Sequence, residues 1–336
     1  MDLLTNDDQQ QLADAFARAA LEMFPLADEH ARATDAQWLQ VAELGWLGIA
    51  ASGAAGGSGL SLAETALLFR EIGRQLVPGP LLSSVLGAKA AAIAGDTALA
   101  AAIIAGERRV ALLSPPDARA VDRRLRVIDG EDADLGLLPA PDATRVYALP
   151  ADREVRVSVD PAASLALCRL PPEPLLTVPT GTADLFAEAV LLIAATAAGM
   201  CEAIRDESAG YAKIREQFGR PIGMFQAVSH RCADMAARAD VAWLQVVMAA
   251  LCHDADAADA RFQIDAARIT AVGGALAGAQ DNVQNHGGMG FTEELPPHRF
   301  VKRAFLLDQL LGGRRATLDR ILAVPRAVVH GDMRAA

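Results

Sequence analysis

The sequence predicts a mainly α protein in three parts: an N-terminal helical domain (residues 1–109), a shortened middle β-domain (110–179) and a C-terminal antiparallel four-helix bundle (180–336). At ~150 residues per domain, 336 residues with 52% apolar content suffice for more than one buried core. Aromatic residues make up only 4%, while Ala, Leu and Val are abundant, and this bias favours helices over sheets. The helical spacing of apolar residues is lost only between Arg109 and Pro179.

The N-terminal part contains clear helix signals separated by glycine-rich breaks. Residues 35–44 carry apolar side chains at helical spacing. Ser61 followed by Glu64 has the form of a capping box and predicts a helix that continues to about Gln75. The glycine cluster at 53–59 lacks the Lys-Ser/Thr ending of a phosphate-binding loop and begins no βαβ unit, so we expect a plain loop there.

The middle and C-terminal parts differ in their periodicity. Short apolar runs separated by Pro, Gly and Asp predict strands and turns, and they lie at residues 110–113, 125–128 and 155–159. Long amphipathic stretches then predict four helices, over residues 183–218, 227–255, 261–285 and 300–323. Four such helices with short connections predict an antiparallel bundle.

Composition excludes several functional classes. Lys and Arg total 31 against 42 Asp and Glu, a net charge of −11, so no nucleic-acid partner is expected. The four cysteines form no CxxC pair, and no Glu-x-x-His motif occurs, which predicts neither a disulfide framework nor a metal site. The N-terminus lacks the basic start of a signal peptide, and no uninterrupted apolar run reaches the ~20 residues of a membrane span. We therefore expect a cytoplasmic protein outside the membrane.

Two segments carry candidate chemistry. In residues 211–226 the pattern predicts that one helix ends at Gly219 and another begins after Pro221, with an Arg and two side-chain amides at the corner. Such an Arg can bind a diphosphate bidentately, or it can stabilise the carbonyl end of a helix. In residues 284–292 glycines follow a helix, where they allow a ligand to approach the backbone or form an ordinary C-cap. Spacing alone leaves both alternatives open.

Taken with residues 38–48, 56–59, 70–74 and 78–80, these two segments resemble the acyl-CoA dehydrogenase family over most of the chain. The resemblance implies a helical domain, a β-domain and a four-helix bundle, with FAD at a dimer interface and the C-terminal motifs reaching the flavin of the neighbouring subunit. It places Gln284 and Gly288 at the pyrophosphate and adenosine end of the cofactor. The implied FAD contacts are Arg215, Gln217, Phe218, Ile222, Phe225, Gln284, Gly287 and Gly288.

The catalytic base of the family has no obvious counterpart. In such enzymes a carboxylate removes the α-proton of the acyl-CoA while the β-hydrogen leaves as hydride to the flavin. The resemblance puts Gly312 at the usual position of this carboxylate and Arg314 where a Thr contacts flavin. Some members carry the base at the start of the first bundle helix, which corresponds to Ala189. The adjacent Glu188 is rotated by ~100° around the helix, so it would serve only if this register is shifted by one residue.

The middle part also departs from the family pattern. Residues 113–117 are the nearest trace of its Thr-Glu-Pro segment, and no Trp lies between Trp46 and Trp243 to pack on a flavin. The half-site that this chain would build for its own flavin is thus reduced, whereas the half-site it would lend to a neighbour is intact. This asymmetry resembles the short subunits of heteromeric acyl-CoA dehydrogenases in bacteria that degrade steroid side chains.

Three hypotheses follow from that resemblance. The favoured one is a subunit without a catalytic base that completes the FAD site of a larger acyl-CoA dehydrogenase-like partner, acting on an acyl-CoA such as a steroid side-chain thioester. The alternative is a self-sufficient homomer that uses Glu188, or with less support Asp308, as its base. The third is a structural paralogue that binds neither flavin nor CoA. The family resemblance also implies electron-transfer flavoprotein as a partner.

Overall fold

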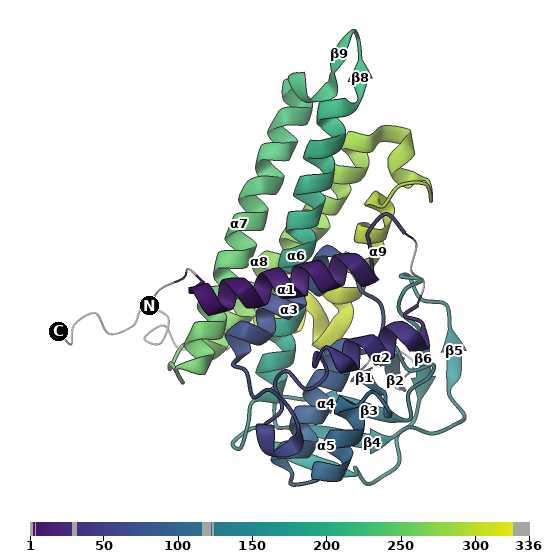
Figure 1. Cartoon of the computed structure of the whole chain (residues 1–336), viewed down its shortest axis with the longest axis vertical. Helices are drawn as coiled ribbons and strands as arrows, with labels where there is room; N and C mark the ends of the chain where they lie inside the picture. The colour runs from purple at the N-terminus through teal and green to yellow at the C-terminus, as the bar shows by residue number, and fades with distance from the viewer. Residues whose placement is uncertain (1–2, 4, 29–31, 116–121, 123, 325–336) are drawn as a thin grey trace, which may run out of the picture.

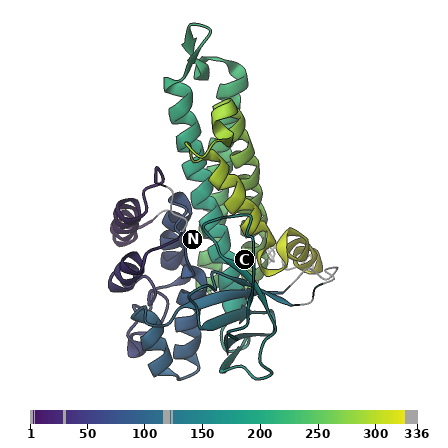
Figure 2. The same cartoon turned by 90° about the vertical axis from the view of Figure 1, so that its right-hand side faces the viewer.

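The chain folds into a broad base, made by the N-terminal helices and a β-sheet, from which a long helical bundle rises (Figures 1 and 2). This computed structural model describes residues 3, 5–28, 32–115, 122 and 124–324. The predicted mainly helical architecture is confirmed. The helices of the base are α1 (Asp7–Met23), α2 (Asp35–Glu43), η1 (Gly53–Ala55), α3 (Leu62–Arg74), α4 (Leu81–Ile93) and α5 (Thr97–Ile104). Those that follow the sheet are α6 (Leu185–Ile214), η2 (Ile222–Met224), α7 (Gln226–Asp254), α8 (Ala260–His286), η3 (Gly287–Phe291), α9 (Pro297–Gln309), η4 (Leu310–Gly312) and α10 (Gly313–Ala323).

Helix α3 begins as the capping box predicts. The Ser61 hydroxyl accepts a hydrogen bond from the Glu64 amide, and the Glu64 carboxylate accepts one from the Ser61 amide. A second carboxylate reaches the same helix end from far along the chain, because Asp254 at the end of α7 accepts hydrogen bonds from the amides of Leu62 and Ala63 at 3.1 and 3.0 Å. Base and bundle are therefore joined at the N-terminus of α3.

The middle segment forms one seven-stranded sheet. Its strands are β1 (Val110–Ser114), β2 (Leu125–Ile128), β3 (Leu135–Pro139), β4 (Ala143–Ala148), β5 (Glu154–Arg156), β6 (Leu165–Cys168) and β7 (Leu176–Pro179). Their order is β5-β6-β2-β1-β3-β4-β7, antiparallel except for the β1–β3 pair. The predicted strands at 110–113 and 125–128 are confirmed, whereas only Glu154–Arg156 of the third run pairs, at the exposed edge of the sheet. Residues 116–117 of the Thr-Glu-Pro trace lie outside the described residues.

Helix α6 is the central helix of the molecule. It packs against α3, α7 and α8, and almost all of its first twenty residues are buried. By length and composition α6 and α7 could each span a membrane, whereas the sequence analysis found no apolar run of sufficient length. The apolar window of α6 is nevertheless buried entirely within the protein, which accounts for its composition without a bilayer, while 39% of the α7 window is buried.

Two predicted helix boundaries are wrong. The helix expected to continue to Gly219 ends at Ile214, and the next residues form a hairpin of β8 (Glu216–Gln217) and β9 (Arg220–Pro221). Its turn residues Phe218 and Gly219 both have positive φ, 54° and 75°, the combination that a type I′ turn requires. A pair of two-residue strands is too short to leave a periodic pattern in the sequence.

The predicted fourth bundle helix is broken into α9 and α10. Three successive residues at the break have positive φ: Leu311 at 51°, Gly312 at 86° and Gly313 at 67°. A right-handed helix cannot pass through such backbone angles, so the chain turns and restarts. The helices predicted at 227–255 and 261–285 match α7 and α8 to within one residue at each end.

Candidate functional site

The two segments with candidate chemistry meet at the end of the bundle that lies farthest from the sheet. The β8–β9 hairpin joins α6 to α7 there, and η3 follows α8 (Figure 1). The rings of Tyr211 on α6 and His286 on α8 stack with centroids 4.0 Å apart and an interplanar angle of 24°. The fold thus brings together segments separated by some seventy residues. We call this end the bundle tip, defined as residues 214–225 and 284–291.

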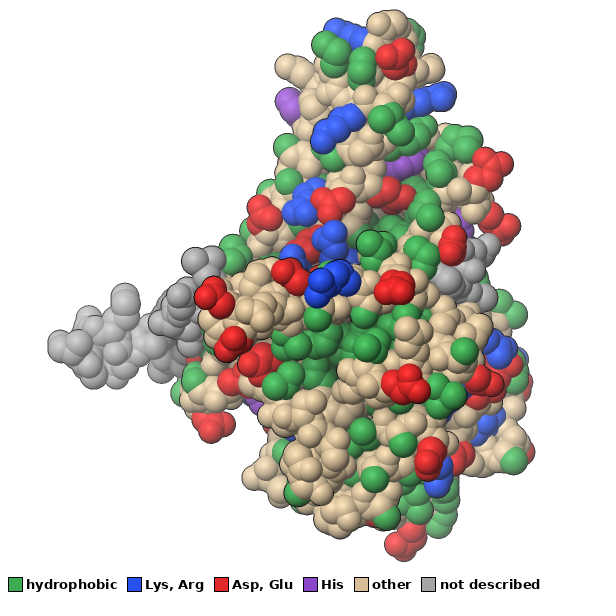
Figure 3. Space-filling model, viewed as in Figure 1, with side chains coloured by type: hydrophobic (Ala, Val, Ile, Leu, Met, Phe, Trp, Pro, Cys, Tyr) green, Lys and Arg blue, Asp and Glu red, His purple; other side chains and the backbone are tan. Residues whose placement is uncertain are grey.

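Exposed apolar side chains gather on the bundle tip beside basic ones (Figure 3). Phe218 is 91% exposed and Phe291 is 79% exposed, which is unusual for aromatic rings that have no partner outside the chain. Ile214 and Met224 are also mostly exposed. A surface of this kind indicates a contact with a ligand or another protein.

The two arginines of the bundle tip differ in their surroundings. The Arg220 guanidinium lies over the Phe225 ring, 4.2 Å from its centroid, and Phe218 meets the same ring edge-on at 6.0 Å. Arg215 is exposed at the end of α6, where its amide donates to the Tyr211 carbonyl at 2.9 Å. Within the part of the chain that the structure describes, the Arg215 side chain makes no hydrogen bond or ion pair. Of these two arginines, Arg215 is the one whose guanidinium makes no such interaction within the described residues, and it is the one we expect to be more available to an anion.

The glycines that follow α8 leave the backbone accessible. Gln284, Gly287 and Gly288 are exposed, and a Cβ built on either glycine would meet no atom within 4 Å. Gly290 differs, because its Cβ would lie 2.6 Å from the Val283 carbonyl oxygen. The first two glycines therefore expose backbone to solvent, while the third is required by packing.

Two of the eight predicted FAD contacts are less accessible than the others. Ile222 is buried, and its amide donates to the Arg215 carbonyl at 2.8 Å, which closes the hairpin onto α6. Phe225 is half-buried beneath Arg220. The structure brings all eight residues to one end of the molecule, and their contacts with a cofactor stay a prediction.

Glu188 lies at the opposite end of α6 from the bundle tip. Its side chain is only 3% exposed, and both carboxylate oxygens accept hydrogen bonds from the Lys89 ammonium on α4 at 2.8 Å. The neighbouring Ala189 is fully buried. The Glu188 carboxylate is thus held in an ion pair in the protein core.

The loop with Gly312 is tightly held. Arg268 on α8, which is buried, donates from Nη2 to the carbonyl oxygens of Leu307 and Leu310. A Cβ at Gly312 would lie 2.9 Å from the Cβ of Ala316, in addition to the strain of a φ of +86°. Asp308 is half-buried and Arg314 is exposed. A side chain at position 312 would therefore need the loop to move.

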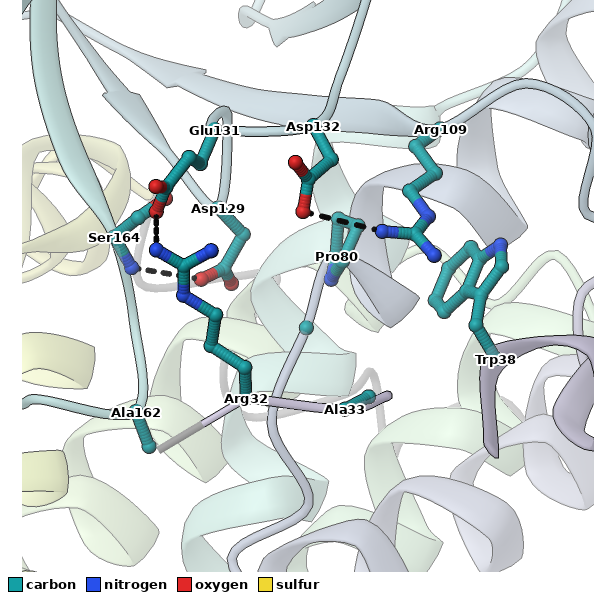
Figure 4. Close-up of a pocket in the computed structure, with 11 residues that line it drawn as sticks. Arg32, Ala33, Trp38, Pro80, Arg109, Asp129, Glu131, Asp132, Ala162 and Ser164 are labelled. Atoms are coloured by element: carbon teal, nitrogen blue, oxygen red, sulfur yellow. Dashed lines mark hydrogen bonds and ion pairs between the residues drawn. The ribbon is translucent and has the colours of Figure 1, made fainter. Parts of the chain in front are cut away.

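Two small hollows adjoin each other, the outer one within the base and the inner one between the base and the bundle. The outer hollow, about 50 Å³, is lined by Arg32, Arg109 and their carboxylate partners Glu131 and Asp132 (Figure 4). The inner cavity, about 70 Å³, is mainly apolar and is bounded by α3, α4, α6, α9 and the strands β1 and β2. Ligand pockets usually measure about 300–1,000 Å³, so neither hollow accommodates a flavin ring or a long acyl chain.

Asp129 lines both hollows. Burial raises its pKa to about 7, although the nearby Arg303 opposes the shift. Arg303 itself is buried, pairs with the buried Asp160 and donates to the Val77 carbonyl at 3.3 Å. This group joins all three parts of the chain. Within the described residues, no three His, Cys, Asp or Glu side chains group closely enough to hold a metal ion.

Comparison with known proteins identifies the family. The domain described as "Acyl-CoA dehydrogenase, N-terminal domain" matches residues 6–105, and the one described as "Acyl-CoA dehydrogenase, C-terminal domain" matches residues 183–324. The acyl-CoA dehydrogenase IpdE2 of Mycobacterium tuberculosis is 36% identical over 276 residues, which cover 79% of each chain. The chain belongs to the acyl-CoA dehydrogenase family.

Other members of the family differ from this chain in length. FadE34 of Mycobacterium tuberculosis is 34% identical over 306 residues, which cover 86% of this chain but only 42% of FadE34. Among solved structures, a chain of the ChsE4–ChsE5 complex from Mycobacterium tuberculosis superposes with a TM-score of 0.81 at 24% identity, covering 97% of this chain and all of that one. The Tcur3481–Tcur3483 steroid acyl-CoA dehydrogenase G363A variant gives 0.78 at 25% identity, covering 98% and 99%.

Sequence reasoning missed several residues of this acyl-CoA dehydrogenase that the structure makes prominent. Asp129, Asp160 and Arg303 come together from distant parts of the chain, and no local spacing marks them. The stack of His286 on Tyr211 was not predicted either, although both residues belong to the segments that carry the family resemblance.

Proposed function

We propose that this acyl-CoA dehydrogenase chain completes the FAD site of a larger partner subunit in the α,β-dehydrogenation of an acyl-CoA. The observation that carries the proposal is the free Arg215 guanidinium at the bundle tip, beside exposed Phe218 and the open backbone of Gly287 and Gly288. These groups face outward rather than into a cavity of the same chain. They therefore suit a cofactor that is bound mainly by another subunit.

The residues of the bundle tip fit FAD chemically. A guanidinium can donate two parallel hydrogen bonds to a diphosphate, and the Gln284 side chain offers a neighbouring donor and acceptor. Accessible backbone at Gly287 and Gly288 allows close approach of a nucleotide. When bound, FAD supplies the hydride acceptor of the reaction.

The proposal assigns no catalytic base to this chain. Gly312 has no side chain, a Cβ there would lie 2.9 Å from the Cβ of Ala316, and the Glu188 carboxylate is engaged by Lys89. The two hollows around Asp129 are also too small for a long acyl chain, which supports placing the acyl site and its base on the partner. The chain's own role is to bind and orient the cofactor from the opposite side.

Names of related structures support a partner and a substrate class. Two of the similar chains come from assemblies named by two proteins each, and one of these is called a steroid acyl-CoA dehydrogenase. We extend this to the present chain as a proposal: a heteromer that acts on a steroid-type acyl-CoA, with electron-transferring flavoprotein as the electron acceptor.

Co-purification tests the proposal. The chain is produced alone and together with a larger acyl-CoA dehydrogenase homologue from the same organism, and bound flavin is quantified by absorbance. We expect FAD and acyl-CoA-dependent flavin reduction only in the co-purified complex. A yellow homomer that is reduced by acyl-CoA, and is inactivated by Glu188→Gln, would instead establish the self-sufficient alternative.

A further inference from the structure

A row of polar side chains crosses the interface between α6 and α8 at the base of the bundle tip, and two of its residues, Asn285 and His286, belong to the tip. We call it the polar seam. Its first two pairs are hydrogen-bonded at 2.7 and 2.9 Å, and its third is the ring stack already described. The three pairs are Glu207 with Asn282, Ser208 with Asn285, and Tyr211 with His286.

Farther from the tip, the same interface is made of small and apolar groups. The Cys201 thiol donates one weak hydrogen bond to the Ala271 carbonyl oxygen at 3.6 Å, and Ile204 faces Gly278. Contacts between small apolar residues change little when one helix slides along the other. Paired polar groups are satisfied in one register only, so a polar row specifies the alignment of two helices.

The polar seam is not an efficient way to stabilise the bundle. Burial raises the pKa of Glu207 to about 7, so the carboxyl is held where its charged form is disfavoured. The Asn282 Oδ1 is buried and has no hydrogen-bond partner within the described residues. Buried polar groups that are incompletely paired reduce stability relative to apolar side chains of similar shape. A row of this kind therefore favours a role in alignment over a role in stability.

The seam connects directly to both parts of the bundle tip. The Tyr211 carbonyl accepts the amide of Arg215, one helical turn further on. On the other side His286 immediately precedes Gly287, and its Nδ1 lies 2.9 Å from the Asn282 carbonyl oxygen, another seam residue. Because burial lowers the pKa of His286, the ring is neutral at pH 7, so Nδ1 carries the proton for this bond. Alignment of α6 and α8 therefore sets the distance between Arg215 and Gly287.

We propose that the six residues of the polar seam are positioning residues, which fix the register of α6 against α8 and so hold Arg215 and the Gly287–Gly288 backbone at the spacing that FAD requires. The inference rests on the proposed function, because it takes these groups as the cofactor contacts. A slip of one helical turn would separate them by roughly 5 Å, too far for one diphosphate to reach both.

The decisive variant makes the first pair apolar. In Glu207→Met combined with Asn282→Leu, we expect an unchanged or higher melting temperature together with about tenfold weaker FAD binding, since a binding site loses affinity when its geometry is loosened. FAD affinity is measured by flavin fluorescence on the assembled protein, with its partner where the chain alone holds no cofactor. Cys201→Ala, in the apolar part of the same interface, is the matched control and leaves FAD affinity unchanged.

A second pair of variants keeps the inference testable if the double variant does not fold. Tyr211→Phe retains the ring stack and should bind FAD normally, whereas Tyr211→Leu should weaken binding. Amide hydrogen exchange without FAD gives an independent readout: Tyr211→Leu should accelerate exchange in residues 215–225 with little change in melting temperature.

The outcomes separate this inference from the proposed function. Normal FAD affinity and normal exchange in the seam variants, alongside weaker binding by Arg215→Ala, would overturn the positioning role and leave the proposed function intact. If Arg215→Ala has no effect on FAD, the proposed function fails. Hydrogen exchange then still decides whether the seam sets the helix register.

Discussion

Gly199 on α6 lies against the backbone of Arg70 on α3, so close that a Cβ built on the glycine would sit 1.8 Å from the Arg70 carbonyl oxygen. One turn away, Gly73 approaches α6 in the same way, since a Cβ built on it would lie 1.9 Å from the Thr196 carbonyl oxygen. The two helices thus cross with their backbones in contact. Around this crossing the Glu202 carboxylate accepts hydrogen bonds from Arg70 and Arg74.

This contact predicts that Gly199→Ala destabilises the protein strongly. The new methyl group meets backbone rather than a flexible side chain, so α3 and α6 must separate, at a cost of about 1–3 kcal/mol or more for overpacking. Gly210→Ala is the matched control on the same helix, because its Cβ meets nothing within 4 Å. The control should stabilise by up to ~1 kcal/mol, the helix propensity difference. Urea denaturation of both variants checks the prediction, which equal effects would contradict.

Arg215→Ala should weaken FAD binding by about 1.5–3 kcal/mol, the contribution of a charge-assisted hydrogen bond, with little change in stability. Lys at position 215 should restore only part of the affinity, since it lacks the bidentate fork. Arg220→Ala is the comparison, because its guanidinium is already engaged over Phe225 and a smaller loss is expected. Calorimetric titration of the assembled protein with FAD measures all three, and a greater loss in the Arg220 variant would reverse the assignment.

Glu188→Gln should lower stability without changing the activity of the complex. The substitution leaves the Lys89 ammonium without its partner, and breaking a buried pair costs up to about 3–5 kcal/mol, less here because Lys89 is partly exposed. Replacing Lys89 by Met as well should recover most of the stability. Thermal melting and stopped-flow flavin reduction test the two parts. Reduction slowed by about 10²-fold would mean that Glu188 is a general base.

Gly312→Glu should not create an active enzyme. The backbone there has a φ of +86° and the new Cβ would meet Ala316, so the substitution is strained by about 1–2 kcal/mol before any carboxylate is placed. Gly312→Ala should show the same loss of stability and thereby isolates the backbone effect. The test is an acyl-CoA dehydrogenation assay of the chain without a partner. Turnover by Gly312→Glu would show that this chain alone contains a complete active site apart from the base.

The raised pKa of Asp129 predicts an unusual dependence of stability on pH. Its pKa is near 4 when unfolded and about 7 when folded, so between these values the folded state binds more protons. The free energy of unfolding should therefore fall as pH rises from 4 to 7, in part also through Glu207, whose pKa is raised similarly. Asp129→Asn should reduce this slope and be more stable than the wild type at pH 8. Urea titrations at several pH values measure this pH dependence in both proteins. The same slope in Asp129→Asn as in the wild type would exclude Asp129 as the source of the effect.

The sequence predicted well those features of the fold that depend on neighbouring residues. The capping box at Ser61 and the long periodic helices α7 and α8 depend on neighbouring residues, and they were predicted nearly to the residue. The hairpin at 216–221 and the break at Leu311 depend on a few backbone angles, which periodicity does not reveal. The predicted tip residues share one surface, yet the burial of Ile222 follows from how the hairpin folds back.

Long-range polar contacts could not be predicted at all. Arg303 and Asp160 lie 143 residues apart, and either would be unremarkable on a helix or loop taken alone. The pairing of Glu188 with Lys89 similarly connects α6 to a helix of the N-terminal domain. Such pairs depend on how the domains dock, which one sequence does not encode in any local pattern.

The geometry at Gly312 also bears on the history of this chain. A single substitution to a carboxylate there meets both an unfavourable backbone angle and the methyl group of Ala316. A catalytic carboxylate at this position would require three changes: in the loop backbone, at Ala316, and in the hydrogen bonds that Arg268 donates to the preceding carbonyl oxygens. None of these changes alone would give a working base. If the chain completes a partner's site as we propose, this loop makes that arrangement hard to reverse, because a carboxylate at position 312 brings no benefit until the surrounding contacts have changed.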